Sequence, residues 1–492
     1  MSIVATKPIE DLKARAGGEV RLKRVLGRVD LTMLGIGAII GTGIFVLTGQ
    51  AAAAHAGPAI VLSMVLAGVV SALAALCYAE FASAVPVAGS AYTYAYATLG
   101  ELVAWIIGWD LILEYALGAA TVAVGWSGYV VSALADLGYR FPPLLSAAPG
   151  TPVVIGDGST ATALFNLPAM LVGVAATVLL VIGIRESARV NAVIVAIKVA
   201  VVLLIIGVGG MFVSSDYWSP FIPSNTGTFG SFGGSGILRG AAVIFFAYIG
   251  FDAVSTAAQE ARNPQRDMPY GIFASLVICT VLYVLVSGVM VGLVPYQQLG
   301  VPAPMALAVD AARLKAAASA WQPLLAVMPL VVKLGAIAGL SSTIIVQMMA
   351  QPRIFMSMAQ DGLLPPWAAT IHPRFHTPHV TTIVTGLIVT LAAGFTSIGV
   401  LGELVSIGTL FAFVVVAIGV IILRRRRPGL DRPFRMPGVP WLPALSAMAS
   451  FALMASLSAE TWIRLLIWMA LGLALYARYG RRHSTLAKRG RV

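Results

Sequence analysis

The most constraining feature of this sequence is a charge-free apolar segment, Leu31 to Ala54, with Gly41-Thr42-Gly43 in its middle. A segment of that length crosses a bilayer as a helix. Gly41 lies ten residues in, which is roughly 15 Å and close to the midplane. Gly-Thr-Gly holds a helix poorly, and unwound backbone at that depth is tolerated only where it lines a cavity or is buried in protein. Its freed N–H groups would suit a carboxylate; close helix packing on small residues is the alternative.

The composition places the rest of the chain in a membrane as well. It is 59% hydrophobic and only 11% charged, which is typical of integral membrane proteins. Because apolar segments of spanning length recur, we predict an all-α integral membrane protein with twelve transmembrane helices. The predicted spans are 31–54, 58–83, 100–133, 163–184, 188–213, 237–260, 270–294, 324–351, 380–397, 401–423, 441–458 and 463–479.

The net charge of +12 is distributed as a topology signal. With the N-terminus inside, 25 of the 32 lysines and arginines fall on the cytoplasmic side. This asymmetry predicts a multi-pass protein of the cell (inner or plasma) membrane with both termini cytoplasmic. The basic clusters then lie next to the lipid bilayer, and no nucleic-acid partner is expected. Residues 1–30 are predicted to be a cytoplasmic N-terminal segment, not a cleaved signal peptide, and 481–492 a cytoplasmic tail.

A second break is predicted in the sixth span, around Phe246-Ala247-Tyr248-Ile249-Gly250. Counted from Ile237, Ala247 is again ten residues in, and spans one and six cross the membrane in opposite directions. Paired breaks of this kind indicate two inverted repeats with a substrate site at the midplane. The repeats would be 31–213 (the first five spans) and 237–423 (spans six to ten), followed by two further spans in 441–480.

A lysine lies at midplane depth in the fifth span. Lys198 is ten residues from Ala188, too deep for its ammonium to reach an interface easily. A buried lysine of this kind can gain and lose a proton, although a permanently charged tie between helices is the alternative. Lys333 in the eighth span is nearer the outer end, and we expect its side chain to extend toward that interface.

Two acids and three hydroxyls interrupt other apolar spans. Asp110 and Glu114 lie four residues apart on one face of the third span. We interpret Asp110 as a structural acid and keep Glu114 as a candidate for proton coupling. Ser341-Ser342-Thr343 in the eighth span would bond to their own helix carbonyls or face an ion or ammonium.

The sequence gives little indication of a metal site, a redox-active cysteine pair or a catalytic nucleophile. Cys77 and Cys279 are interpreted as small buried hydrophobes, and the five histidines show no metal-ligand spacing. We therefore expect no metal, no cofactor and no enzyme activity.

The sequence resembles the cationic amino acid transporter family of the amino acid–polyamine–organocation superfamily, in its bacterial form. The likeness extends from the first span to beyond the tenth. Two departures are Gln259 before Glu260, where the family usually has two acids, and the lack of the two further spans of vertebrate members. The matching segments are Gly35 to Phe45, Ala79 to Tyr94, Gly108 to Tyr115, Phe245 to Pro269, Arg353 to Leu364 and Arg432-Pro433-Phe434-Arg435.

The resemblance implies the leucine-transporter-like fold and secondary transport of L-amino acids by alternating access. The substrate carboxylate would meet N–H groups of the first break, and the ammonium would meet carbonyls freed at both breaks. Phe246 and Tyr248 would be candidates for an aromatic lid. Lys198 would stand where sodium-coupled relatives bind sodium, beside span-one carbonyls and Ser341 or Ser342. The predicted substrate-binding residues are Ile39, Ile40, Gly41, Thr42, Gly43, Phe246, Ala247, Tyr248, Ile249, Ile344 and Ile345.

These features favour proton-coupled uptake of small or medium neutral amino acids. Ile344 and Ile345 are bulky and apolar, and a cationic side chain needs an acid or several carbonyls at the far end of its pocket. Glu114 is expected to brace the first span. The alternatives are exchange of cationic amino acids or polyamines, and a transporter-like sensor. A small accessory membrane protein is conceivable as a partner, but nothing in the residues identifies one.

Overall fold

The structure is a computed structural model of the whole chain. It describes residues 6–8, 26–84, 90–155, 158–183, 188–251, 254, 261–315 and 321–486. Predictions that concern residues 9–25, Gln259, Glu260 and 487–492 lie outside this set.

The described residues form a helical membrane protein. Seven helical runs are long and apolar enough to cross a membrane, and four apolar helices are shorter. The twelve spans therefore stay a prediction. The seven runs are Gly43–Ala84, Glu101–Asp136, Asn191–Phe212, Pro264–Leu293, Gln322–Gln360, Ile398–Arg426 and Ala459–His483, and the shorter helices are Leu167–Ile182, Gly233–Tyr248, His379–Phe395 and Trp441–Ser456.

The first of these runs contains a turn that separates two predicted spans. Gly57 adopts φ +60°, a conformation that suits glycine, and Pro58 follows it. The sharp change of direction ends the helical segment that carries the first break and begins α4 (Ile60–Ala84).

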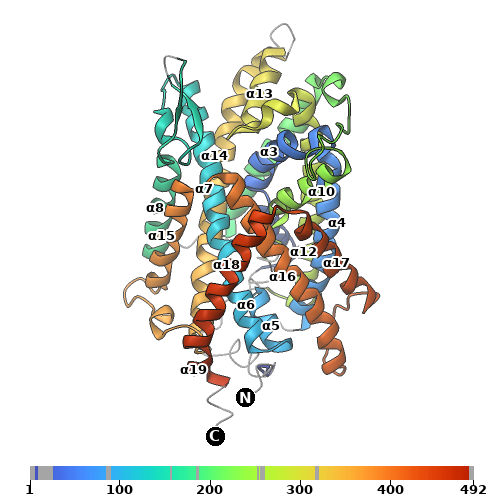
Figure 1. Ribbon diagram of the computed structural model, residues 1–492, viewed down its shortest axis with the longest axis vertical. Coiled ribbons are helices and arrows are strands. Elements are labelled where there is room, and N and C mark those ends of the chain that lie inside the picture. Colours follow the sequence, from blue (N-terminus) through green and yellow to red (C-terminus); the bar gives the residue numbers. More distant parts are fainter. Residues whose placement is uncertain are drawn as a thin grey trace.

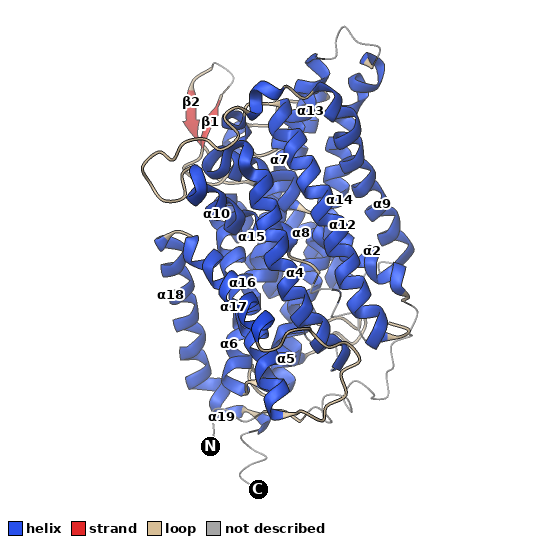
Figure 2. Cartoon of the chain, turned by 90° about the vertical axis from the view of Figure 1, so that its right-hand side faces the viewer, coloured by secondary structure: helices blue, strands red, loops and turns tan. Residues whose placement is uncertain are grey.

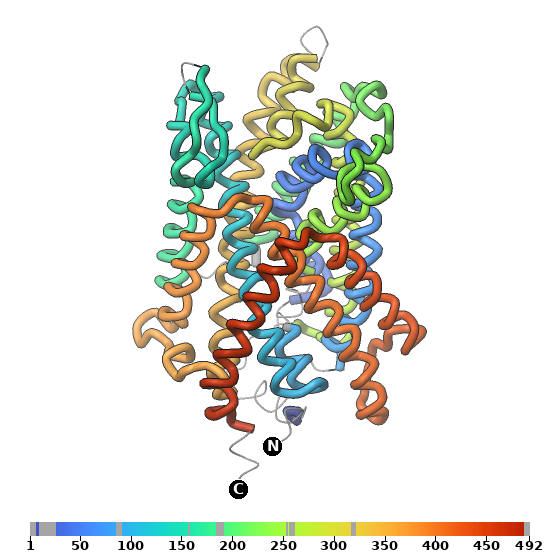
Figure 3. Tube along the Cα trace, viewed as in Figure 1, coloured from blue at the N-terminus to red at the C-terminus, as the bar shows by residue number. Residues whose placement is uncertain are grey.

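The helices run mainly along the long axis of the molecule (Figure 1). α2 (Arg28–Ile39) lies against α12 (Pro264–Leu293) and α9 (Ala188–Leu204). α14 (Gln322–Gln360) has 39 residues, runs the length of the molecule (Figure 3), and packs against α7 (Gly118–Asp136) and α9. The other helices are α3 (Thr48–Ala51), α5 (Ser90–Thr98), α6 (Glu101–Ile112), α8 (Leu167–Ile182), α10 (Gly233–Ile244), α13 (Pro304–Lys315), α15 (His379–Phe395), α16 (Ile398–Arg426), α17 (Trp441–Ser456), α18 (Ala459–Leu475) and α19 (Arg481–His483).

The two ends of the molecule differ in their elements (Figure 2). α5 and α19 lie at one end, which the charge distribution predicts to be cytoplasmic. α13 and an antiparallel hairpin of β1 (Pro152–Val154) and β2 (Thr160–Thr162) lie at the other, with Val153 opposite Ala161.

Lys333 has partners that its position in the eighth predicted span does not reveal. Its side chain is only 1% exposed. The ammonium lies 2.7 Å from Asp136 at the end of α7 and 3.1 Å from Asp310 in α13. Two carboxylates from distant parts of the chain stabilise the buried charge, and spacing along one helix gives no sign of them.

Candidate functional site

The first predicted break is present. α2 ends at Ile39, Ile40 is extended (φ −70°, ψ 96°), and a π-helical segment begins at Gly43. Among the described residues, the backbone amides of Gly41, Thr42 and Gly43 donate no backbone hydrogen bond. These are the unsatisfied donors at the start of a helix, where a carboxylate is stabilised by the N–H groups and by the helix dipole.

The second break faces the first. A 3-10 turn, Phe245–Tyr248, is followed by extended Ile249 and by Gly250 at φ +122°. A Cβ added at Gly43 would lie 2.8 Å from the nitrogen of Ala247, and one at Gly250 would lie 2.7 Å from the carbonyl carbon of Ala38. Both glycines are therefore required for the two interrupted segments to lie backbone against backbone.

A small cavity of about 20 Å³ adjoins the two breaks. One face of α14 forms one wall of the cavity. Gly41 of the first break approaches this face of α14, because a Cβ added at Gly41 would lie 3.3 Å from Thr343. The cavity is lined by Ala38, Tyr115, Ile249, Gly250, Thr343, Val346, Gln347 and Ala350.

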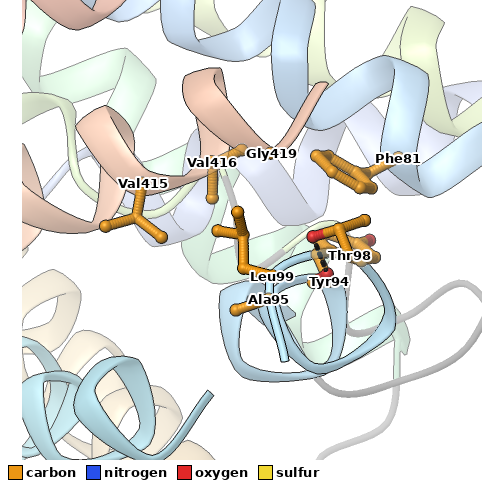
Figure 4. A pocket seen from close by; sticks show the side chains of 8 residues that line it. All are labelled: Phe81, Tyr94, Ala95, Thr98, Leu99, Val415, Val416 and Gly419. Atoms are coloured by element: carbon orange, nitrogen blue, oxygen red, sulfur yellow. Dashed lines mark hydrogen bonds between the residues drawn. The ribbon is translucent and has the colours of Figure 1, made fainter. Parts of the chain in front are cut away.

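A second hollow, between α5 and α16, lies away from the breaks (Figure 4). Its walls are mainly apolar, the hydroxyl of Thr98 donates to the carbonyl of Tyr94, and it has no room for a water molecule. We do not assign it a ligand.

Lys198 lies beside the first break, as its depth predicts. It is fully buried, and its ammonium donates to the carbonyl oxygen of Gly37 at 2.7 Å and to the hydroxyl of Thr343 at 2.9 Å. Gly339 makes room for it, because a Cβ there would lie 2.9 Å from Cγ of the lysine. One side chain thus joins α9, α2 and α14.

The hydroxyl partner differs from the prediction. Ser341 donates to the carbonyl of Ile337 and accepts from the indole of Trp126, while Ser342 is buried. Successive helix residues point about 100° apart. The order Ser-Ser-Thr therefore does not reveal which of the three faces α9, and Thr343 was missed as a contact of the lysine.

The α14 side of the cavity also differs from the prediction. Thr343, Val346, Gln347 and Ala350 line it, a set spaced i, i+3, i+4 and i+7 on one helix face. Ile344 is buried and Ile345 half-buried, and neither belongs to the cavity wall. A helical projection from Thr343 would have identified Gln347 and Ala350.

Of the two aromatic residues predicted to form a lid, Tyr248 and Phe246, only Phe246 stays a candidate. Tyr248 does not form a lid: its hydroxyl donates to the carbonyl of Met64 in α4, and its ring lies edge-on against Tyr283. Tyr283 donates to the carbonyl of Ile39 at 2.7 Å, which occupies one lone pair of a predicted ammonium ligand. Phe246 keeps its candidacy, with its backbone N–H bonded to Ser406.

The two acids of the third predicted span are both buried. Asp110 has no hydrogen-bond partner among the described residues and lies against α16, where a Cβ at Gly408 would be 3.1 Å from its Oδ1. Glu114 is 1% exposed in the π-helical segment Leu113–Leu117. Its coupling role stays a prediction.

No group of histidine, cysteine, aspartate and glutamate residues that could hold a metal ion occurs within the described ranges. Cys77 and Cys279 are free thiols in buried positions.

Comparisons with known proteins give one consistent family. The model of the family described as amino acid permease matches residues 26–475. The chain is 45% identical to the methylthioribose transporter of Bacillus subtilis, over 99% of this chain and 100% of that protein. It is 46% identical to a branched-chain amino acid permease of the same organism, over 99% of both. A vacuolar cationic amino acid transporter of Arabidopsis thaliana is 40% identical over 86% of this chain and 67% of its own length.

Proposed function

The chain belongs to the amino acid permease family, and we propose that it is a secondary active transporter that takes up small or medium neutral L-amino acids together with protons. Transport of amino acids is the activity that the family and the permease relatives support. Proton coupling, the substrate class, the twelve-helix fold with inverted repeats and the cytoplasmic termini are our proposals.

The contact of Lys198 with Gly37 and Thr343 carries the proposal of proton coupling. A protonated ammonium bridges α9 to the part of α2 that precedes the break and to α14. The neutral amine lacks the charge that strengthens these hydrogen bonds. Loss of the proton therefore loosens this part of α2 and favours release of substrate. A difference of about 1–3 kcal/mol in substrate affinity between the two states is enough for useful coupling.

The donors and carbonyls at the two breaks support an amino acid as the ligand. The carboxylate would bind the amides of Gly41, Thr42 and Gly43, and the ammonium the carbonyls of Ile39, Phe246 and Ile249. None of the eight residues that line the cavity is acidic, so a cationic side chain there would lack a counterion. The lining therefore favours a neutral side chain.

The names of the relatives supply the ligands to compare, because these proteins are named for methylthioribose, branched-chain amino acids and cationic amino acids. Purified protein would be heated with alanine, leucine, arginine, alaninamide or methylthioribose, and its melting temperature measured. We expect stabilisation by alanine and none by alaninamide, which lacks the carboxylate. Stabilisation by arginine above that by alanine, or by methylthioribose alone, would overturn the proposed substrate class.

A further inference from the structure

Two glutamines on α14 stand out among the buried polar residues. Gln351 is 0% exposed, and neither its Oε1 nor its Nε2 has a hydrogen-bond partner among the described residues. Gln347 is 8% exposed, and its Oε1 also has none. A buried amide without partners is costly, so groups of this kind are normally bonded to other protein groups or to ordered water.

The glutamines continue the helix face that begins at the lysine contact. Thr343, Gln347 and Gln351 are spaced four residues apart, so their side chains lie above one another, about 6 Å apart along the axis. Thr343 accepts the hydrogen bond from Lys198 and also forms part of the cavity wall. Gln347 lines the same cavity.

The cavity is the right size for water. Its volume of about 20 Å³ exceeds the 10–15 Å³ or so that one water molecule requires. Its lining includes the hydroxyl of Thr343 and the amide of Gln347, and a Cβ at neighbouring Gly118 would lie 2.9 Å from Oε1 of that glutamine. Of the ionisable groups near this face, Lys198 on α9 contacts Thr343 and Tyr115 lies on the cavity wall. Glu114 and Asp110 lie on segments that pack against α14, and Asp110 itself lies against α16.

We propose that bound water follows α14 from Thr343 past Gln347 to Gln351 and carries the proton of Lys198 toward the predicted cytoplasmic side. This inference rests on the proposed proton coupling. The ammonium gives its proton to the nearest water and becomes a neutral amine; the proton then passes from water to water and leaves as hydronium. The glutamines keep their protons and orient the water molecules, since an amide is both donor and acceptor.

We call this row of bound water, from Thr343 to Gln351, the water track. Side chains close the protein between Gln351 and the predicted cytoplasmic end. Met358 and Tyr92 pack against α6, where a Cβ at Gly108 would lie 2.7 Å from the sulfur and 3.0 Å from the ring. Asp361, at the end of α14, binds both Lys7 at 2.7 Å and Tyr92 at 2.9 Å. Release of a proton therefore requires these contacts to separate, which couples its exit to opening of that side.

Water in the track is tested directly by hydroxyl-radical footprinting, in which an X-ray pulse converts bound water into radicals that label adjacent side chains. Tyr115 lies on the cavity wall and is only 3% exposed. We expect it to be labelled in the wild type and labelled about tenfold less in Gln347→Leu, which removes a hydrogen bond to the water. Tyr129, which is fully buried and bonded to the carbonyl of Phe45, is the unlabelled control. An unlabelled Tyr115 in the wild type would overturn the proposal.

Proton conduction is tested in liposomes. Gln351→Leu, which lies outside the cavity lining, should slow accumulation driven by a proton gradient by about tenfold, and leave substrate exchange at equal pH unchanged. Gln360→Leu, the same substitution at an exposed position of α14, should match the wild type in both assays. The melting temperatures should not fall, because leucine is of similar size and leaves no unsatisfied group.

Two outcomes separate this inference from the proposed function. If exchange falls as much as accumulation, the glutamines serve passage of the substrate and the proton track is wrong. If the wild type ignores the proton gradient while Tyr115 is labelled, proton coupling fails and the water has no role in carrying protons.

Discussion

The ammonium of Lys198 lies 2.7 Å from the carbonyl oxygen of Gly37, which joins α9 to the last turn of α2 before its break. Its hydrogen bond to Thr343 attaches the same ammonium to α14. The chain therefore holds three helices together at the predicted substrate site through one ionisable group.

The Thr343 hydroxyl gives the first prediction. Thr343→Val keeps the shape and removes one hydrogen bond to the ammonium. A hydrogen bond to a charged group contributes about 1.5–3 kcal/mol, so the ratio of internal to external substrate at steady state should fall by about tenfold. Ser341→Ala should have a much smaller effect, because that hydroxyl bonds Ile337 and Trp126. Equal losses in the two variants would contradict the placement of the lysine.

The glycines of the first break give a graded prediction. In Gly43→Ala the new Cβ would meet the backbone of Ala247, which cannot move without shifting the second break. We expect binding and transport to be lost. In Gly41→Ala the Cβ lies 3.3 Å from the methyl of Thr343, which has freedom to shift, so transport should be reduced and not lost. Labelled alanine uptake measures both.

Gly399→Ala is the matched control, because a Cβ at that position has no atom within 4 Å apart from its chain neighbours and the backbone of its own helix. Wild-type uptake is expected. Full activity of Gly43→Ala would show that the two breaks do not need to be in contact.

Lys333 gives a prediction about stability. Lys333→Met leaves Asp136 and Asp310 facing one another without their cation. Removal of one partner of a buried pair costs about 3–5 kcal/mol, and we expect the lower end because the two aspartates are 30% and 29% exposed. The melting temperature should fall clearly.

Arg313→Met, at an exposed position of α13, should leave the melting temperature unchanged. Asp136→Asn should cause a smaller fall than Lys333→Met, because Asp310 still pairs with the lysine. A melting temperature of Lys333→Met equal to that of the wild type would mean that the ion pairs contribute nothing measurable.

The sequence predicts those features that one segment of the chain determines, and it does not predict contacts between helices that are distant in the chain. The break at Gly41 to Gly43 and the depth of Lys198 follow from one segment each, and the structure places both at the same site. Choosing Thr343 over Ser341 requires the rotation of α14 about its axis, which three adjacent hydroxyls do not reveal. The partners of Lys333 and Tyr248 come from other helices, so only tertiary structure identifies them.

In the proposed mechanism, protonation of Lys198 drives transport. Its most direct test is the accumulation of labelled alanine by wild type and Lys198→Ala in liposomes, with an inward proton gradient and no sodium. We expect the wild type to concentrate alanine above the outside level, and Lys198→Ala only to reach that level. Wild-type uptake that follows a sodium gradient and ignores pH, or accumulation by Lys198→Ala under the proton gradient, would contradict it.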